Sequence, residues 1–388
     1  MATVEPIVKN NIRDRARFVA ETYAGPASTE VDRDARFPIE AIQALRADGL
    51  LGVLIPPELG GPGVSMSEVA DSVTELSRHC ASTAMIYAMH QIQVACIVRH
   101  GHSEFFRDYM RDLVETQPLL ASATTEAGIG GDTRTSGCFV DRDGDRFRLE
   151  KNAPVISYGQ SADAILTTAR RGPDSAPNDQ VLVLCAPPGL TLEPKGEWDT
   201  FGFRGTCSLG FHLAAEGDVK NILTDTFDVI SRRTMLPVAH VLWGSVWLGL
   251  ASEAVDRSRA HVRSEARKKP GVTPPAAVRL AELVATLEQM RSLVKSAARR
   301  YDEVVEDPDA LDAMGFALQM NALKISASTL VVDIVGRAMT ICGMAGYRED
   351  SPLTLGRLLR DAHGAAVMVN NDRIIANNAQ MLLVHKDR

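Results

Sequence analysis

Hydrophobic residues in the first third of the chain recur at helical spacing. In FPIEAIQALRADGLLGVL, residues 37–54, the apolar side chains include Ile39, Ile42, Leu45 and Leu50. This period places them on one face of a helix. A loop rich in glycine and proline, IPPELGGPG, follows at 55–63, and residues 66–80 and 84–99 return to small and apolar side chains. The pattern predicts an N-terminal helical domain over residues 1–119.

Between residues 119 and 213 the pattern changes to short runs that alternate apolar and polar side chains. Examples are LLASATTE at 119–126, QVLVLCAP at 180–187 and TCSLGFHL at 206–213, with glycine, aspartate, proline and asparagine between such runs. The DRDGDR tract at 141–146 is a turn signal, so we expect a β-hairpin there. These features predict a middle β domain over residues 120–226.

Helical spacing returns after Asp225 and continues almost to the last residue. Segment 275–304 carries a broad apolar stripe, formed by Leu280, Leu283, Leu287, Met290, Val294 and Ala297. The window 235–255 approaches the length of a membrane span, but polar residues and a proline interrupt it, so we expect a buried central helix. The sequence predicts a C-terminal helical bundle over residues 227–388 and, with the first two segments, an α+β protein.

Composition and charge restrict the partners. The chain has 42 basic and 49 acidic residues and a formal net charge of −7, which argues against nucleic acid and against an anionic membrane surface as partners. Its six cysteines are scattered without a CxxC pair, so we expect a reduced chain with no disulfide scaffold and no metal site. The N-terminal sequence has no apolar core after a basic start, so we expect no signal peptide and a cytoplasmic protein.

Six short motifs carry the most specific information. They are GLLGVLIPPELGGPG at 49–63, ELSRHCAST at 75–83, ASATTEAGIGGD at 121–132, WDTFGFRGTCSLGF at 198–211, ICGMAGYRED at 341–350 and GRLLRDA at 356–362. Their order and separations resemble the acyl-CoA dehydrogenase superfamily. The resemblance implies an N-terminal helical domain, a middle β domain and a C-terminal four-helix bundle, with FAD, or else FMN, between the last two. It also implies a homodimer or homotetramer, because an adjacent subunit completes the site in this family.

Cofactor and substrate positions follow from the resemblance residue by residue. Thr125 matches the hydroxyl residue that bonds the flavin ring and Gly130 a backbone contact, although a strand and a glycine-rich turn without a ligand would have the same sequence. Ser157 keeps the hydroxyl of a flavin-packing motif, whereas Val155 stands where the family has a shielding tryptophan. The implied cofactor contacts are Thr124, Thr125, Gly130, Gly131, Val155, Ser157, Gly343, Met344, Asn371 and Arg373, and the implied substrate contacts are His90, Gly131 and Tyr347.

Several positions depart from the family pattern or leave two interpretations open. Tyr158 could replace the lost aromatic surface or be a half-buried tyrosine of the sheet. Arg263 or Arg267 could replace the family's Arg-x-x-Phe-Gly, or could belong to the solvated end of a basic helix. Arg204 and Ser208 fall in the family's Gly-x-Arg-Gly motif, and we expect them at a domain interface.

The catalytic base of the family has no counterpart in this sequence. In the family, a glutamate removes the α-proton of an acyl thioester while the β-hydride leaves to the flavin. The step needs a carboxylate with a raised pKa in an apolar pocket, and donors to the thioester carbonyl. The glutamate position falls on Val369, and the position that other members use on the buried helix falls on Ala239. Neither side chain can accept a proton.

Two titratable residues are candidates to replace the base. His240 follows the empty helix position, and histidine is the side chain most easily poised near neutral pH. A core histidine with a backbone partner is the alternative. Asp372 lies three residues after Val369, so it shares that face if the helix continues, or else it pairs with Arg373 or Arg360.

Three functions remain open at this point. The first is oxidation of an acyl-CoA or a carrier-protein-bound acyl thioester at the CH–CH bond, with an unidentified electron acceptor or reductase. The second is a flavin monooxygenase of the same fold, which needs no α-proton base and activates oxygen on reduced flavin. The third is a non-catalytic or flavin-poor homologue that acts in assembly.

Two further histidines are candidates for the site. We expect His363 near the mouth of the site, and His90 either in the pocket or in ordinary helix packing.

Overall fold

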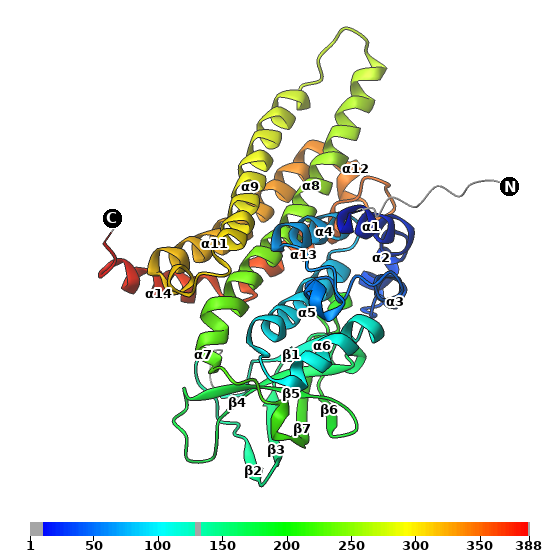
Figure 1. Cartoon of the computed structure of the whole chain (residues 1–388). Coiled ribbons are helices and arrows are strands. Elements are labelled where there is room, and N and C mark those ends of the chain that lie inside the picture. Colours follow the sequence, from blue (N-terminus) through cyan, green and yellow to red (C-terminus); the bar gives the residue numbers. More distant parts are fainter. Residues whose placement is uncertain (1–10, 129–132, 387–388) are drawn as a thin grey trace, which may run out of the picture.

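The computed structural model describes residues 11–128 and 133–386, and it separates into helical and sheet regions (Figure 1). The sheets lie at one end of the molecule. The tips of the two long helices α8 (Leu236–Lys268) and α9 (Ala276–Val304) project at the opposite end. Helices precede and follow the sheet strands, as predicted, so the α+β fold class is confirmed. The residue ranges of the three domains stay predictions.

The N-terminal helices form a layer that packs against α8. They are α1 (Ile12–Val19), α2 (Gly25–Arg33), α3 (Ile39–Ala47), α4 (Met66–His79), α5 (Ala81–His100) and α6 (Glu104–Thr116). The start of α4 follows from its sequence, because Ser65 and Glu68 form a reciprocal capping box. Helix α5 is made of small and apolar residues and is buried on almost every side, so it is the centre of this layer.

Two sheets form the middle of the chain. The first has the order β1-β4-β5, from β1 (Leu120–Ala123), β4 (Ala164–Arg170) and β5 (Gln180–Cys185), and β1 runs parallel to β4. The second has the order β2-β3-β7-β6, from β2 (Asp141–Asp143), β3 (Arg146–Ala153), β7 (Gly210–Asp218) and β6 (Leu190–Lys195). The hairpin predicted at DRDGDR is confirmed, because Asp143 pairs with Arg146 and Gly144 adopts a φ of +59° in the turn between them.

The C-terminal helices surround α8. They are α7 (Phe227–Ile230), α8, α9, α10 (Pro308–Asp312), α11 (Met314–Cys342), α12 (Met344–Tyr347), α13 (Gly356–Val367) and α14 (Asn371–Leu382). The predicted stripe of α9 faces the interior, since Leu283, Leu287, Met290, Val294 and Ala297 are all buried. Helix α11 packs along both α8 and α9, which completes the core of the bundle.

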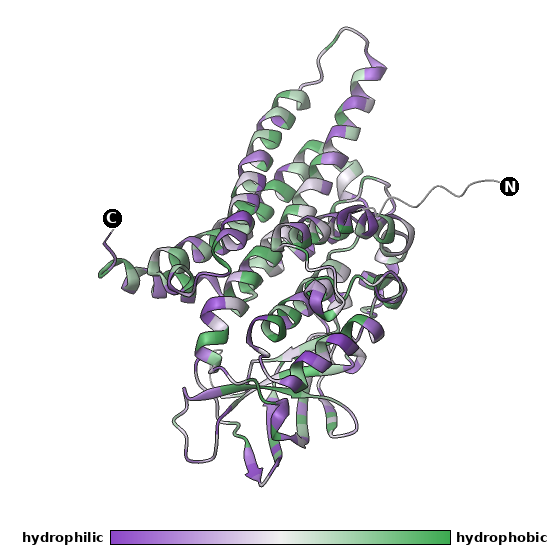
Figure 2. Cartoon of the chain, viewed as in Figure 1, coloured by the Kyte–Doolittle hydropathy of each residue, from purple (hydrophilic) through white to green (hydrophobic). Residues whose placement is uncertain are grey.

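Three helical runs are long and apolar enough, by length and composition alone, to cross a membrane. They are Ala81–His100, Phe227–Lys268 and Met314–Cys342. The apolar windows of the first two are 89% buried inside the protein, so the buried central helix predicted around residues 235–255 is confirmed. Figure 2 shows hydrophobic residues where the helices pack together and mostly hydrophilic residues at the projecting end of α8.

A close contact fixes the sheet region against the C-terminal helices. The backbone N–H of Phe203 donates a hydrogen bond to Asp361 Oδ1 on α13 at 2.6 Å. A Cβ on Gly202 would lie 2.3 Å from the carbonyl oxygen of Arg360, so only glycine allows this approach. The contact sets the position of α13, and α13 leads directly into the loop that carries Val369.

Candidate active site

Val369, the predicted position of the family's glutamate, lies in a short loop between α13 and α14. Its φ is +54°, which is uncommon for a β-branched residue, and its side chain is 42% exposed. The next residue, Asn370, caps α14, because its side-chain oxygen accepts a hydrogen bond from Asp372 N at 2.8 Å. The loop therefore has a defined conformation but presents no titratable side chain at the base position.

Lys324 of α11 lies directly beneath this loop. Its Nζ is 2.5 Å from the carbonyl oxygen of Val369 and 2.6 Å from Oδ1 of Asn371. The Asn371 amide also donates to the hydroxyl of Ser328, one turn further along α11, at 3.0 Å. The Lys324 side chain is completely buried, and desolvation lowers its pKa to about 8. The sequence predictions missed this residue. A signal was present, because Lys324 is the one charged residue in the apolar run LKISASTLVV.

His240 is held against α11, with its ring buried at 2% exposure. Its Nδ1 lies 3.1 Å from the carbonyl oxygen of Met320. Because a carbonyl can only accept, Nδ1 carries the proton of the neutral ring and Nε2 is a bare acceptor. Nε2 is buried and has no partner among the residues that the structure describes. Burial, and then the charge of Lys324, lower the His240 pKa to about 4, so the ring is neutral at pH 7.

Two tryptophans of α8 extend this polar neighbourhood. The rings of His240 and Trp243 are 6.3 Å apart, and the Lys324 ammonium lies 5.9 Å from the centre of the Trp247 ring. Both indole N–H groups are buried without a partner within the described part of the chain. His240, Trp243, Trp247 and Lys324 thus form a seam of polar and aromatic side chains between α8 and α11. The seam ends at the Val369 loop.

The other candidate bases are placed differently. Asp372 is exposed in the first turn of α14, without the apolar surroundings that the family's carboxylate has. His363 is exposed on α13, and its ring meets Phe201 edge-on at 6.0 Å. Ala239 is 3% exposed and inert. Neither Asp372 nor Ala239 therefore provides a carboxylate in an apolar pocket.

Of the two interpretations left open for His90, the structure shows ordinary packing and not a pocket. The ring is 0% exposed, its Nε2 lies 2.8 Å from the carbonyl oxygen of Leu51, and its Nδ1 accepts from Leu120 N at 3.0 Å. Both nitrogens are used by the backbone, and burial lowers the His90 pKa to about 4. His90 is a core histidine that joins α5 to the first strand.

Two of the predicted flavin contacts meet at one edge of the sheet region. The hydroxyl of Thr125 donates to the carbonyl oxygen of Val155 at 3.1 Å, and Val155 is 37% exposed. Ser157 follows with its hydroxyl accepting from Ser208 at 2.9 Å, while Thr124 is half-buried beside Thr125. This edge combines hydroxyl groups with an exposed apolar side chain. Predicted contacts Gly130 and Gly131 lie outside the described residues.

Tyr158 does not replace the lost aromatic surface. Its ring is 1% exposed, and its hydroxyl donates to the carbonyl oxygen of Leu120 at 2.9 Å. The alternative interpretation as a structural tyrosine of the sheet region is therefore the right one. Arg204 behaves as predicted for an interface residue, because its Nε donates to the backbone oxygen of Asp32 on α2 at 2.8 Å.

The α11–α12 junction offers a second open surface. Gly343 has a φ of +55°, and a Cβ built on it would meet nothing within 4 Å. Met344 is 66% exposed and Tyr347 71% exposed, so two large side chains face outward here.

The remaining predicted cofactor contacts lie elsewhere. Asn371 is bound to Lys324, and Arg373 is exposed on α14. Arg263 and Arg267 are exposed near the projecting end of α8, which fits the solvated helix end.

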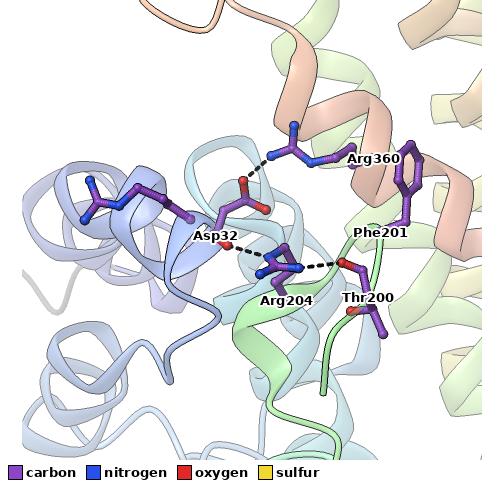
Figure 3. A pocket seen from close by; sticks show the side chains of 6 residues that line it. Asp32, Thr200, Phe201, Arg204 and Arg360 are labelled. Carbon is purple, nitrogen blue, oxygen red and sulfur yellow. Dashed lines mark hydrogen bonds and ion pairs between the residues drawn. The ribbon is translucent and has the colours of Figure 1, made fainter. Parts of the chain in front are cut away.

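A pocket of about 370 Å³ lies where α2, the loop at 200–206 and α13 meet (Figure 3). Arg360 pairs with the Asp32 carboxylate, and Arg204 bonds the backbone of Asp32 and Thr200. Figure 3 shows these side chains bridging the three elements. The arginines are already occupied by protein partners, so this pocket joins elements and adds no titratable group to the Val369 loop.

Comparison with known proteins places the chain in a family. Residues 9–117 match the acyl-CoA dehydrogenase N-terminal domain and residues 229–372 the acyl-CoA dehydrogenase C-terminal domain, together nearly two thirds of the chain. A probable acyl-CoA dehydrogenase, FadE25 of Mycobacterium tuberculosis, is 26% identical over 363 residues, which cover 92% of this chain and 90% of that protein.

Solved structures share the fold. Butyryl-CoA dehydrogenase from Megasphaera elsdenii superposes with a TM-score of 0.83 at 20% identity, covering 99% of this chain and 100% of that one. FMN-bound TdsC of Paenibacillus sp. A11-2, a dibenzothiophene monooxygenase, also gives 0.83 at 21% identity, covering 97% and 98%. The structural likeness thus includes a dehydrogenase and a monooxygenase. From the two domain matches and the full-length relatives, the chain belongs to the acyl-CoA dehydrogenase family of flavoprotein oxidoreductases.

Proposed function

We propose that this protein oxidises an acyl thioester at its Cα–Cβ bond with a bound flavin as the hydride acceptor. The observation that carries the proposal is the loop at Val369. The loop at the predicted glutamate position is a defined and anchored turn, although it carries no acid at residue 369. Relatives that are named acyl-CoA dehydrogenases over nine tenths of this chain support the same reaction class.

The residues at the sheet edge and at the α11–α12 junction fit a flavin. Thr125, Val155 and Ser157 would hold the ring with hydroxyl groups and one apolar face. Gly343 leaves room for the close approach of a pyrophosphate, and exposed Met344 offers apolar surface to a cofactor or to a second subunit. FAD is the proposed flavin and FMN the alternative. When bound, it supplies a two-electron acceptor.

The proton is assigned to His240. Its Nε2 is a bare acceptor with a tautomer fixed by Met320, which is the arrangement that a general base requires. The pKa of about 4 makes it a weak base, so we propose a slow reaction compared with enzymes that keep the glutamate. Exposed Asp372 is the less suitable acceptor.

The acyl carrier, the electron acceptor, the oligomeric state and the location in the cell are also proposed. Coenzyme A or a carrier protein would carry the acyl group, and a separate acceptor or reductase would take the electrons. We propose a cytoplasmic homo-oligomer without a nucleic-acid or membrane partner, in line with the net charge of −7.

One observation favours a second candidate, an oxygen-using flavin monooxygenase. No raised-pKa carboxylate stands at Val369 or at Ala239, and a monooxygenase does not need one. The fold of FMN-bound TdsC is compatible with this second function.

Product analysis separates the dehydrogenase from the monooxygenase. We expect turnover with an acyl-CoA and an artificial electron acceptor to give a product lighter by two hydrogens. An oxygenated product formed only with supplied reduced flavin would replace the dehydrogenase proposal with the second candidate.

A further inference from the structure

Lys324 carries a buried charge that no described residue neutralises with a carboxylate. Its side chain is 0% exposed, and no carboxylate of a described residue lies within salt-bridge distance of its Nζ. A buried ammonium without a counter-ion is costly, and its attraction to neutral oxygens offsets only part of that cost. An apolar residue of similar length would pack in the same place without this penalty, so the charge needs a reason.

The contacts of the ammonium supply the reason. Two of its donors go to the Val369 loop, one to the backbone oxygen of Val369 and one to Asn371 at the start of α14. Its third side faces the Trp247 ring of α8. A single side chain from α11 therefore joins α8, the end of α13 and the beginning of α14. The residue whose conformation it fixes, Val369, has a φ that its side chain disfavours.

The same charge acts on His240. Both residues line the seam between α8 and α11, and the charge of Lys324, after the larger effect of burial, opposes protonation of the ring. The contacts of the ring come from Met320 on α11 and from Trp243 on its own helix, and neither is titratable. Removing the Lys324 charge should therefore raise the His240 pKa, while removing only a loop contact should not.

We propose that Lys324 is a positioning residue that ties the Val369 loop to α11, and that its charge adds to the burial that keeps the Nε2 atom of His240 free of a proton. This inference rests on the proposed function only for its catalytic meaning. The two physical effects, on the loop and on the histidine, exist with or without the reaction, so they can be measured without substrate.

The experiment compares Lys324→Met, Asn371→Ala and the control Lys295→Met, which removes a lysine of α9 that lies away from the loop. Amide hydrogen exchange reports on residues 367–372. NMR of protein with carbon-labelled histidines reports the pKa of His240. Its signal is identified as the one that is missing from the spectrum of His240→Gln. For Lys324→Met we expect exchange in the loop to rise at least about tenfold and the His240 pKa to rise. For Asn371→Ala we expect faster loop exchange with an unchanged His240 pKa. The control should change neither.

Each result decides the inference. Wild-type exchange in the loop of both Lys324→Met and Asn371→Ala would overturn the anchoring role. An unchanged His240 pKa in Lys324→Met would overturn the electrostatic role.

If Lys324→Met does not fold, Asn371→Ala still tests the anchor. Raising the pH of the wild-type protein past the Lys324 pKa of about 8 tests it again, because a neutral amine should hold the loop less tightly. Failure of acyl-thioester oxidation with both physical effects present would contradict the proposed function and leave this inference standing.

Discussion

The Lys324 ammonium lies 2.5 Å from the carbonyl oxygen of Val369 and so ties α11 to the loop that the sequence predicts as the position of the family's glutamate. The two residues are far apart in the chain and come from α11 and from the α13–α14 junction. The loop has a defined and anchored conformation, and its side chain at position 369 is not an acid.

Restoring the acid should therefore restore fast proton removal. We expect Val369→Glu to accelerate reduction of the bound flavin by acyl-CoA on the order of 10²-fold, the contribution of a well-placed general base. Rapid-mixing absorbance under anaerobic conditions measures it. The control is Val367→Glu, which places a carboxylate on a valine two positions away that is more exposed, at 74% against 42% for Val369. Equal behaviour of the two variants would show that position 369 no longer faces the reacting carbon.

His240 as the proton acceptor predicts a particular pH profile. Its pKa is lowered to about 4 by burial and by Lys324, and only the neutral ring can accept a proton. Activity should be flat above about pH 5 and fall as the pH drops through the folded pKa. His240→Gln should lose about 10- to 100-fold in rate with little change in melting temperature. A profile that instead rises through pH 6 to 8, or full activity in His240→Gln, would remove the residue from the mechanism.

The buried charge of Lys324 also predicts a stability effect. Its pKa is lowered from 10.5 to about 8 by desolvation, so the unfolded chain binds the proton more tightly than the folded one. The free energy of unfolding should gain a favourable contribution as the pH rises from about 8 to about 10.5. Denaturant titrations at both ends of this window measure it. Lys324→Met should abolish the contribution, and at pH 7 it should not be less stable than the wild type.

Asp361 predicts the opposite dependence at acidic pH. Burial raises the pKa of this carboxyl from 3.8 to about 6, despite the nearby guanidinium of Arg357. Its contribution to the free energy of unfolding should therefore fall as the pH rises from about 4 to 6 and then stay level. Asp361→Asn keeps an acceptor for Phe203 N and should remove this dependence. Asp361→Ala leaves that N–H unpaired and should cost about 1–3 kcal/mol. Equal stability of the two variants would contradict the role of the hydrogen bond.

The sequence is informative where the responsible interactions are local. The apolar stripe of α9 and the turn at Gly144 depend on neighbouring residues, so periodicity and turn chemistry predict them. In both cases the residues concerned lie in one helix or one hairpin. Two family motifs predict Thr125 and Val155 as contacts of the same cofactor, and the Thr125 hydroxyl bonds the carbonyl oxygen of Val155, 30 residues later.

Other features depend on packing between distant segments, which a single sequence does not reveal. His90 looked like a pocket residue, but both of its nitrogens bond backbone groups from other parts of the chain. The tautomer of His240 is set by Met320, 80 residues later. The lysine at 324 is visible in an apolar run, but its role depends on partners 45 and 47 residues later, which the sequence does not reveal.

The most direct test of the account is anaerobic mixing of the flavin-loaded wild-type protein with a panel of acyl-CoA thioesters, with no added reductant. The account predicts that at least one thioester bleaches the flavin absorbance and is recovered as the enoyl thioester, slowly in the wild type and faster in Val369→Glu. Flavin that stays oxidised with every thioester in both proteins, or a protein that binds no flavin, would contradict it.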